Sequence, residues 1–147
     1  MRFSAGFVMR FGAGQKYGDK MNDKVMASVR VVVPAEFRFV ALCRVTAASL
    51  AAELQFDVDQ IEELRIAVNE LVSMVVEVSP VGSEIELVYG IDIDCLRVEG
   101  RNHAVADVDT PVADGLTTQV LDAVVDGYGW LGASFWLEKR RPPGDGR

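Results

Sequence analysis

The spacing of apolar and polar positions along the chain predicts a strand followed by two helices. The β-branched run from Ser28 to Val33 stops at Pro34 and is typical of a strand. From Phe37 to about Leu54, apolar residues recur every three or four positions, which predicts a helix with one buried face. That face is predicted to contain Phe37, Val40, Ala41, Val45, Ala48 and Ala52.

A second helix is predicted to begin at Asp57 or Asp59, because either aspartate can cap free backbone N–H groups. Asp59 is followed three residues later by Glu62, the spacing of a capping box. The helix is expected to end at residues 80–83. Its core stripe is predicted to be Ile61, Leu64, Val68, Leu71, Val75 and Val78.

The second half of the chain predicts a hairpin, a third helix and a short terminal strand or pair of strands. Alternation over 84–89 and 96–99, with a turn at 92–94, indicates an antiparallel hairpin. Residues 103–113 are loop-like, and Asp114 is expected to cap a third helix. The aromatic, Gly-rich stretch 127–137 is typical of one or two short strands. This order predicts an α+β fold: a two-layer sandwich whose mostly antiparallel sheet carries helices on one face.

Composition fits one globular domain. The chain has 147 residues, 50% apolar and 25% charged, with a formal net charge of −7. Cys43 and Cys95 lie in apolar stretches without a spacing motif, which favours two buried thiols over a disulfide framework. Charges or Pro interrupt every apolar run before the roughly 18 residues that a membrane span needs. The apolar run near the start ends at Arg10 and has no small-residue cleavage pattern after it, so a signal peptide is not predicted. These features predict a cytoplasmic protein.

Charge is distributed unevenly. Residues 1–24 carry five Lys/Arg and two Asp/Glu, a net of +3, whereas residues 25–147 carry ten and twenty, a net of −10. We expect 1–27 to be a disordered or wrongly annotated leader rather than a nucleic-acid arm, 28–138 to be the domain, and 139–147 to be a flexible tail. An acidic body repels nucleic acid and favours basic protein partners.

Most catalytic and metal chemistry is disfavoured by the residues available. His103 is the only histidine, and a solvated loop histidine is the expected interpretation of it. Neither cysteine has a nearby base or cation in the sequence that would favour a thiolate. Two Cys and one His far apart in the chain lack any zinc spacing, so no metal site is predicted.

Glu70 is the one candidate base. It lies off the main stripe of the second helix, on a flank that also contains Ile66, Ala67 and Met74 and is largely apolar. Two interpretations stay open for it: an edge residue that reaches solvent, or a general base that faces a pocket.

The segments Arg44 to Leu54 and Ile61 to Glu70 resemble the first two helices of the bacterial anti-sigma-factor serine kinases. These proteins act in sporulation and general-stress switches, within the histidine-kinase/Hsp90-like ATPase superfamily. The similarity extends from about Val29 to Leu137. It implies a histidine-kinase-like ATPase fold, a base at Glu70, a partner-facing position at Arg44 and homodimers that form through the sheet.

Several positions depart from the family pattern. Met74 stands where the family has an asparagine that helps to hold Mg²⁺, and a thioether is a poor ligand for that ion. The adenine-recognition motif is represented by Asn102, with Ala104 in place of a glycine. The phosphate segment resembles Gly115 and Leu116, followed by β-branched Thr117 where a second glycine belongs. About a dozen residues separate Asn102 from Gly115, which predicts a shortened nucleotide lid.

These departures converge on one ligand and favour loss or serious weakening of ATP·Mg²⁺ binding, so no cofactor is expected. The favoured function is an anti-sigma-factor-like regulator that binds a sigma factor, a small anti-sigma-factor antagonist, or both, without catalysis. One alternative is an active ATP-dependent serine-protein kinase that uses Glu70. Another is a noncatalytic accessory domain whose partner is not a sigma factor. Neither nucleic acid nor a membrane is an expected partner.

Overall fold

The computed structural model describes residues 26–105 and 113–143, which form one five-stranded sheet and a layer of helices. The strands are β1 (Ala27–Pro34), β2 (Glu84–Ile91), β3 (Cys95–Arg101), β4 (Gly127–Leu131) and β5 (Ser134–Arg140). The helices are the 3-10 turn η2 (Phe37–Phe39), α3 (Val40–Glu53), α4 (Val58–Glu77) and α5 (Gly115–Val124). The expected leader, the loop 106–112 that contains the expected short lid, and the last four residues of the tail lie outside the described residues.

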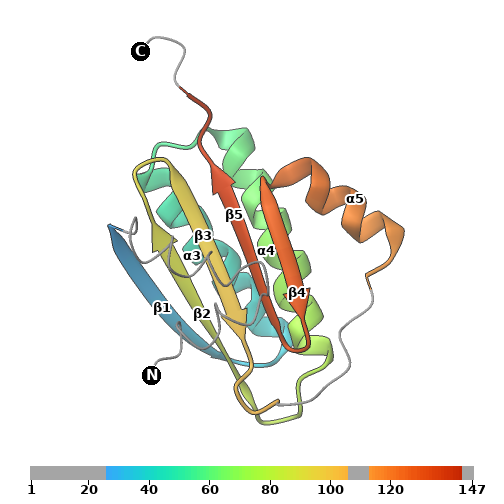
Figure 1. Cartoon of the computed structure of the whole chain (residues 1–147). Helices are drawn as coiled ribbons and strands as arrows, with labels where there is room; N and C mark the ends of the chain where they lie inside the picture. Colours follow the sequence, from blue (N-terminus) through green and yellow to red (C-terminus); the bar gives the residue numbers. More distant parts are fainter. Residues whose placement is uncertain (1–25, 106–112, 144–147) are drawn as a thin grey trace.

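All neighbouring strands are antiparallel, in the order β1-β2-β3-β5-β4, and Figure 1 shows α3 and α4 together behind the sheet. The predicted α+β class is therefore confirmed, and the arrangement is compatible with a histidine-kinase-like ATPase fold. Side chains alternate between the two faces of the sheet. The face toward the helices holds the core, with Leu87, Val98, Phe135 and Leu137 fully buried. Within the described residues, no helix is long and apolar enough to cross a membrane.

Helix α4 agrees with the prediction from its stripe. Leu64, Val68, Leu71 and Val75 are all buried against the sheet and α3. The capping residue is Asp57, whose carboxylate accepts the Gln60 N–H at 2.8 Å while the Gln60 side chain accepts the Asp57 N–H at 2.9 Å. The capping box therefore begins at the first of the two candidate aspartates and uses Gln60 rather than Glu62.

Helix α3 contradicts the predicted burial. Its buried residues are Val40, Cys43, Ala47 and Ala51, so the buried face is rotated about the helix axis from the predicted one. Only Val40 of the predicted face is buried, and Phe37 and Val45 are 59% and 55% exposed. Apolar residues occur on every side of this helix, so spacing alone does not select a face.

The boundaries drawn at 28 and 138 fall inside strands. Ala27 is the first residue of β1, and β5 continues through Lys139 to Arg140. Lys139 is buried because its side chain lies on the helix side of the sheet, where it donates to Glu63 Oε1 at 2.9 Å and to the Val124 carbonyl at 2.6 Å. A charged side chain with two such acceptors is stable in the interior, so the assignment of 139 and 140 to a flexible tail is wrong.

Candidate functional site

The structure brings Arg44 and Glu70 together on the outer surface of the helical layer. They line one pocket of about 330 Å³ together with Glu62, Arg65, Ile66 and Asn69. Arg44 comes from the middle of α3, and the other residues come from the exposed side of α4. We call this the Arg44–Glu70 pocket. Arg44 was predicted as a partner contact and Glu70 as a candidate base. The two residues therefore belong to the same pocket.

A chain of side-chain contacts connects three helices at this pocket. The Arg44 guanidinium donates to Asn69 Oδ1 at 2.6 Å, and the Asn69 amide donates to Glu70 Oε2 at 3.5 Å. The hydroxyl of Thr117, in the first turn of α5, donates to Glu70 Oε1 at 3.5 Å. Both contacts with Glu70 are long, so they orient the carboxylate more than they stabilise it. Neither the role of Asn69 nor the contact from Thr117 was predicted from the sequence, although Asn69 directly precedes Glu70.

Arg44 has an uncompensated charge within the described residues. Its short partner is the neutral amide of Asn69, and no described carboxylate lies within ion-pairing distance of it. Arg65, the other arginine of the pocket, pairs with Glu62 at 3.6 Å. Besides the Arg65–Glu62 pair, the pocket therefore presents one cation without a counterion, Arg44, and one half-buried carboxylate, Glu70.

Met74 belongs to the core rather than to the pocket. It is 8% exposed and packs with the other buried residues of α4. One turn after Glu70, this helix therefore offers a buried thioether where Mg²⁺ would need an oxygen ligand. Among the described residues, no group of three or more His, Cys, Asp or Glu side chains is arranged to hold a metal ion. The donor set beside Glu70 does not fit Mg²⁺, because the nearest amide oxygen, on Asn69, already accepts from Arg44.

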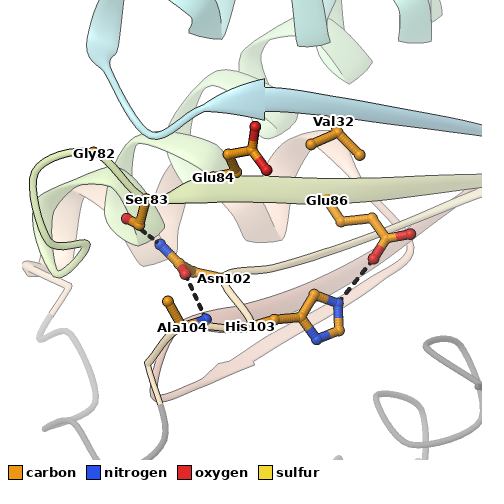
Figure 2. A pocket seen from close by; sticks show the side chains of 8 residues that line it. All are labelled: Val32, Gly82, Ser83, Glu84, Glu86, Asn102, His103 and Ala104. Atoms are coloured by element: carbon orange, nitrogen blue, oxygen red, sulfur yellow. Dashed lines mark hydrogen bonds and ion pairs between the residues drawn. The ribbon is translucent and has the colours of Figure 1, made fainter.

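Asn102 lies at the end of β3, and its buried side chain joins three segments by hydrogen bonds, so we call it a clip. Its amide group donates to Ser79 Oγ and Ser83 Oγ, both at 2.8 Å, and its carbonyl oxygen accepts the Ala104 N–H at 2.9 Å. Figure 2 shows the bonds to Ser83 and Ala104. These bonds join the end of α4, the turn before β2 and the residues after β3. With both N–H bonds donated and 1% exposure, the side chain has little capacity left for a ligand.

Asn102 lines a second pocket, of about 370 Å³, with residues of β1, β2 and the turn before β2 (Figure 2). His103 lies in it and is not simply solvated as expected, because its Nε2 lies 2.8 Å from Glu86 Oε1. Arg30 forms an ion pair with the other oxygen of Glu86. Glu86 is itself buried, so these two neighbours compensate a carboxylate that is shielded from water.

Gly115 and Leu116, which resemble the phosphate segment, form the first two residues of α5. The Asp114 carboxylate caps this helix by accepting the Thr117 N–H at 2.7 Å, and that hydrogen bond lowers the pKa of Asp114. Leu116 points to solvent, and a Cβ added at Gly115 would meet no atom within 4 Å. Glycine is therefore not needed for space here, and a carboxylate already uses one of the N–H groups that would bind phosphate.

Comparison with known proteins gives a partial match. Over 81 residues, the chain is 31% identical to the serine-protein kinase RsbW of Bacillus cereus strain B4264, and equally so to that of strain G9842. Over that part, the chain resembles RsbW. The match covers 53% of this chain and 50% of each relative, so the chain spans about half the length of the curated relatives it matches. No family model matches the chain. The similarity to a serine-protein kinase agrees with the resemblance stated above from the two helix segments.

Proposed function

We propose that this protein is an anti-sigma-factor-like regulator that binds a sigma factor, an anti-sigma-factor antagonist, or both, and that its ATP binding is weakened or lost. One observation carries the proposal: the outer side of α3 is apolar, exposed and adjacent to Arg44. Leu42 and Val45 on α3 and Ile66 on α4 are 49%, 55% and 43% exposed. An exposed apolar group with an unpaired cation beside it is typical of a protein-binding surface.

Three features of the nucleotide motifs support the loss of ATP binding. Met74 is buried and offers no oxygen, Asn102 uses its amide within the protein, and Asp114 caps the helix that would receive phosphate. If each costs about 1–3 kcal/mol, as for an unmade buried hydrogen bond, two of them lower affinity by roughly 30-fold to 10⁴-fold. Glu70 is then a surface carboxylate of the binding face rather than a base.

The binding experiment uses the full chain and the sigma factors and antagonist domains encoded beside its gene. Calorimetry is expected to give a complex with at least one of them. Val45→Glu is expected to weaken that complex by at least about tenfold, because it places a charge in an apolar contact. Ile93→Glu is the matched control, since Ile93 is also exposed but lies in the β2–β3 turn. If no neighbour binds, or if both variants bind alike, this function is wrong.

Titration with ATP and Mg²⁺ separates the proposal from the active kinase. The regulator is expected to give no saturable heat at micromolar nucleotide, and phosphate is not expected to appear on a serine of the bound partner. Micromolar binding that strengthens with Mg²⁺ would restore Glu70 as a base and favour the kinase.

A further inference from the structure

Asn69 orients the Arg44 guanidinium in the Arg44–Glu70 pocket. Its Oδ1 accepts from Arg44 at 2.6 Å, although the two residues are 25 positions apart in the chain and lie on different helices. An arginine side chain in water samples many rotamers, and ordering it when a partner binds costs free energy. The short hydrogen bond orders Arg44 before a partner arrives, so the pocket is preorganised at its cation.

Glu70 determines which way the Asn69 amide faces. A guanidinium only donates hydrogen bonds and a carboxylate only accepts them, so an amide between the two has one orientation that satisfies both. In that orientation the Asn69 amide N–H donates to Glu70 Oε2 at 3.5 Å, and Oδ1 faces Arg44. The Thr117 hydroxyl donates to the other Glu70 oxygen, also at 3.5 Å. Glu70 therefore acts on Arg44 through Asn69.

The acceptor for Arg44 is neutral, which distinguishes Arg44 from the other arginines of η2, α3 and α4. Arg38 pairs with Glu36 at 2.8 Å, and Arg65 pairs with Glu62 at 3.6 Å. A guanidinium has five N–H donors in a planar fork. Toward the described residues, Arg44 uses one of these donors, and the amide that accepts it does not cancel the charge. The remaining donors and the positive charge are available to a ligand.

A carboxylate is the ligand that these donors fit. Arginine binds a carboxylate through two parallel N–H···O bonds, and such charge-assisted bonds are about twice as strong as bonds between neutral groups. Glu70 lines the same pocket and repels a phosphate group, which carries nearly two negative charges, more strongly than a carboxylate, which carries one. The pocket therefore favours an acidic side chain over a phosphate.

The apolar surroundings indicate that the carboxylate comes from a protein. Leu42 and Val45 lie beside Arg44 on α3, Ile66 lines the pocket, and all three apolar side chains are exposed. A protein that covers them excludes water and strengthens the contact with the guanidinium. The net charge of −10 over residues 25–147 favours basic partners by itself, but the charge left unpaired at this surface is positive.

We propose, on the basis of the proposed function, that Asn69 is a positioning residue of the partner-binding surface. It orients Arg44 and leaves the charge of Arg44 available for a carboxylate of the bound partner protein. Asn69→Asp would orient the guanidinium as well, but it would also neutralise it. The neutral amide is therefore the side chain that this surface requires.

The test measures the affinity of the full chain for the sigma factor or antagonist domain that binds it, by calorimetry at low and at high salt. Asn69→Asp is expected to weaken the complex by at least about tenfold and to reduce its salt dependence, because the new carboxylate pairs with Arg44. Asn69→Ala is expected to weaken the complex about three- to tenfold and to keep its salt dependence, because Arg44 is then disordered but still charged. A merely structural role of Asn69 would not change the salt dependence in one variant alone.

Two further variants serve as controls. Ser73→Ala truncates a half-buried side chain of α4 that does not line the pocket, and it is expected to leave the affinity unchanged. Arg44→Ala is expected to weaken the complex by at least about tenfold. Once Arg44 is absent, the two Asn69 variants are expected to change the affinity by less than about twofold, because their effects depend on the guanidinium.

Weaker binding by both Asn69 variants, with reduced salt dependence in Asn69→Asp only, supports the proposal. If Val45→Glu weakens the complex but Asn69→Asp binds as tightly as the natural chain, the proposed function stands and Asn69 does not position Arg44 for a partner. The same conclusion follows if the Asn69 variants weaken the complex equally with and without Arg44. If the natural chain binds no neighbour, the proposed function is wrong, and the role of Asn69 falls with it.

Discussion

Helices α3 and α4 lie side by side, yet their sequences specify their orientation to different degrees. Polar residues occupy one side of α4 and apolar residues the other, so its buried stripe follows from the spacing. Helix α3 is apolar on all sides, and it buries Cys43, Ala47 and Ala51 while Val45 stays exposed. A helix of this kind has more apolar surface than one sheet can cover. The uncovered remainder of α3 is the surface that the proposed function uses.

The largest expected effect contrasts a buried leucine of α4 with an exposed valine of α3. Leu64→Ala is expected to destabilise the protein by about 2–5 kcal/mol, because Leu64 is fully buried and its loss leaves a cavity. Val45→Ala is expected to change the free energy of unfolding by less than about 0.5 kcal/mol. Urea unfolding of both variants measures the contrast. Similar losses in the two variants would mean that α3 is covered on its outer side.

Glu99 extends the contrast to the sheet, since it is buried on the face that none of the described helices covers. Its pKa is about 8 in the folded protein and near 4.5 in the unfolded chain. Below pH 4.5 the carboxyl is protonated in both the folded and the unfolded state, so it does not lower the free energy of unfolding. Between pH 4.5 and 8 the carboxyl ionises only in the unfolded chain, so the free energy of unfolding falls, by a total on the order of 5 kcal/mol at about 1.36 kcal/mol per pKa unit.

Glu99→Gln is expected to remove this decline, because an amide stays neutral at every pH in the range. Urea unfolding at pH 5 and pH 9 measures it: the variant should gain stability over the natural protein at pH 9 only. Glu84→Gln is the control, since Glu84 is exposed. A decline that persists in Glu99→Gln would mean that Glu99 is solvated or paired.

The two asparagines sharpen the comparison between a structural clip and a surface contact. Asn102→Ala removes the three hydrogen bonds of a side chain that is 1% exposed and leaves a cavity in its place, so a loss of about 2–4 kcal/mol is expected. Asn69→Ala affects only the contacts at the Arg44–Glu70 pocket and is expected to cost less than about 1 kcal/mol. Thermal and urea unfolding compare them. Equal costs would contradict the assignment of Asn102 as a clip.

The smallest effect concerns the start of α4. Asp57→Ala is expected to cost about 1 kcal/mol, because it removes the oxygen that accepts the Gln60 N–H. Asp59→Ala keeps this cap and should cost no more than about 0.5 kcal/mol, through the loss of a favourable charge in the first turn. The difference between the two free energies of unfolding measures which aspartate caps the helix. A larger loss from Asp59→Ala would contradict the observed capping box.

Much of the local structure was predictable because it depends on neighbours in the sequence. The hairpin around Asp92, the third helix capped by Asp114 and the stripe of α4 all follow from spacing and from short-range hydrogen bonds. Part of the site was predictable in the same way, since Glu70 lies on the flank of a clear stripe. Its contact with Thr117 was not, because 47 residues separate the two side chains.

Periodicity, capping residues and charge order therefore specify which segments become helices and strands and which class of fold they form, since these signals act within a few residues. Only tertiary packing decided which side of α3 packs against the sheet. It also decided that Asn102 joins three segments by hydrogen bonds and that Glu99 is buried. Each of these outcomes depends on competition between distant surfaces for a limited buried area. A helix with apolar residues all round has no local reason to prefer one side.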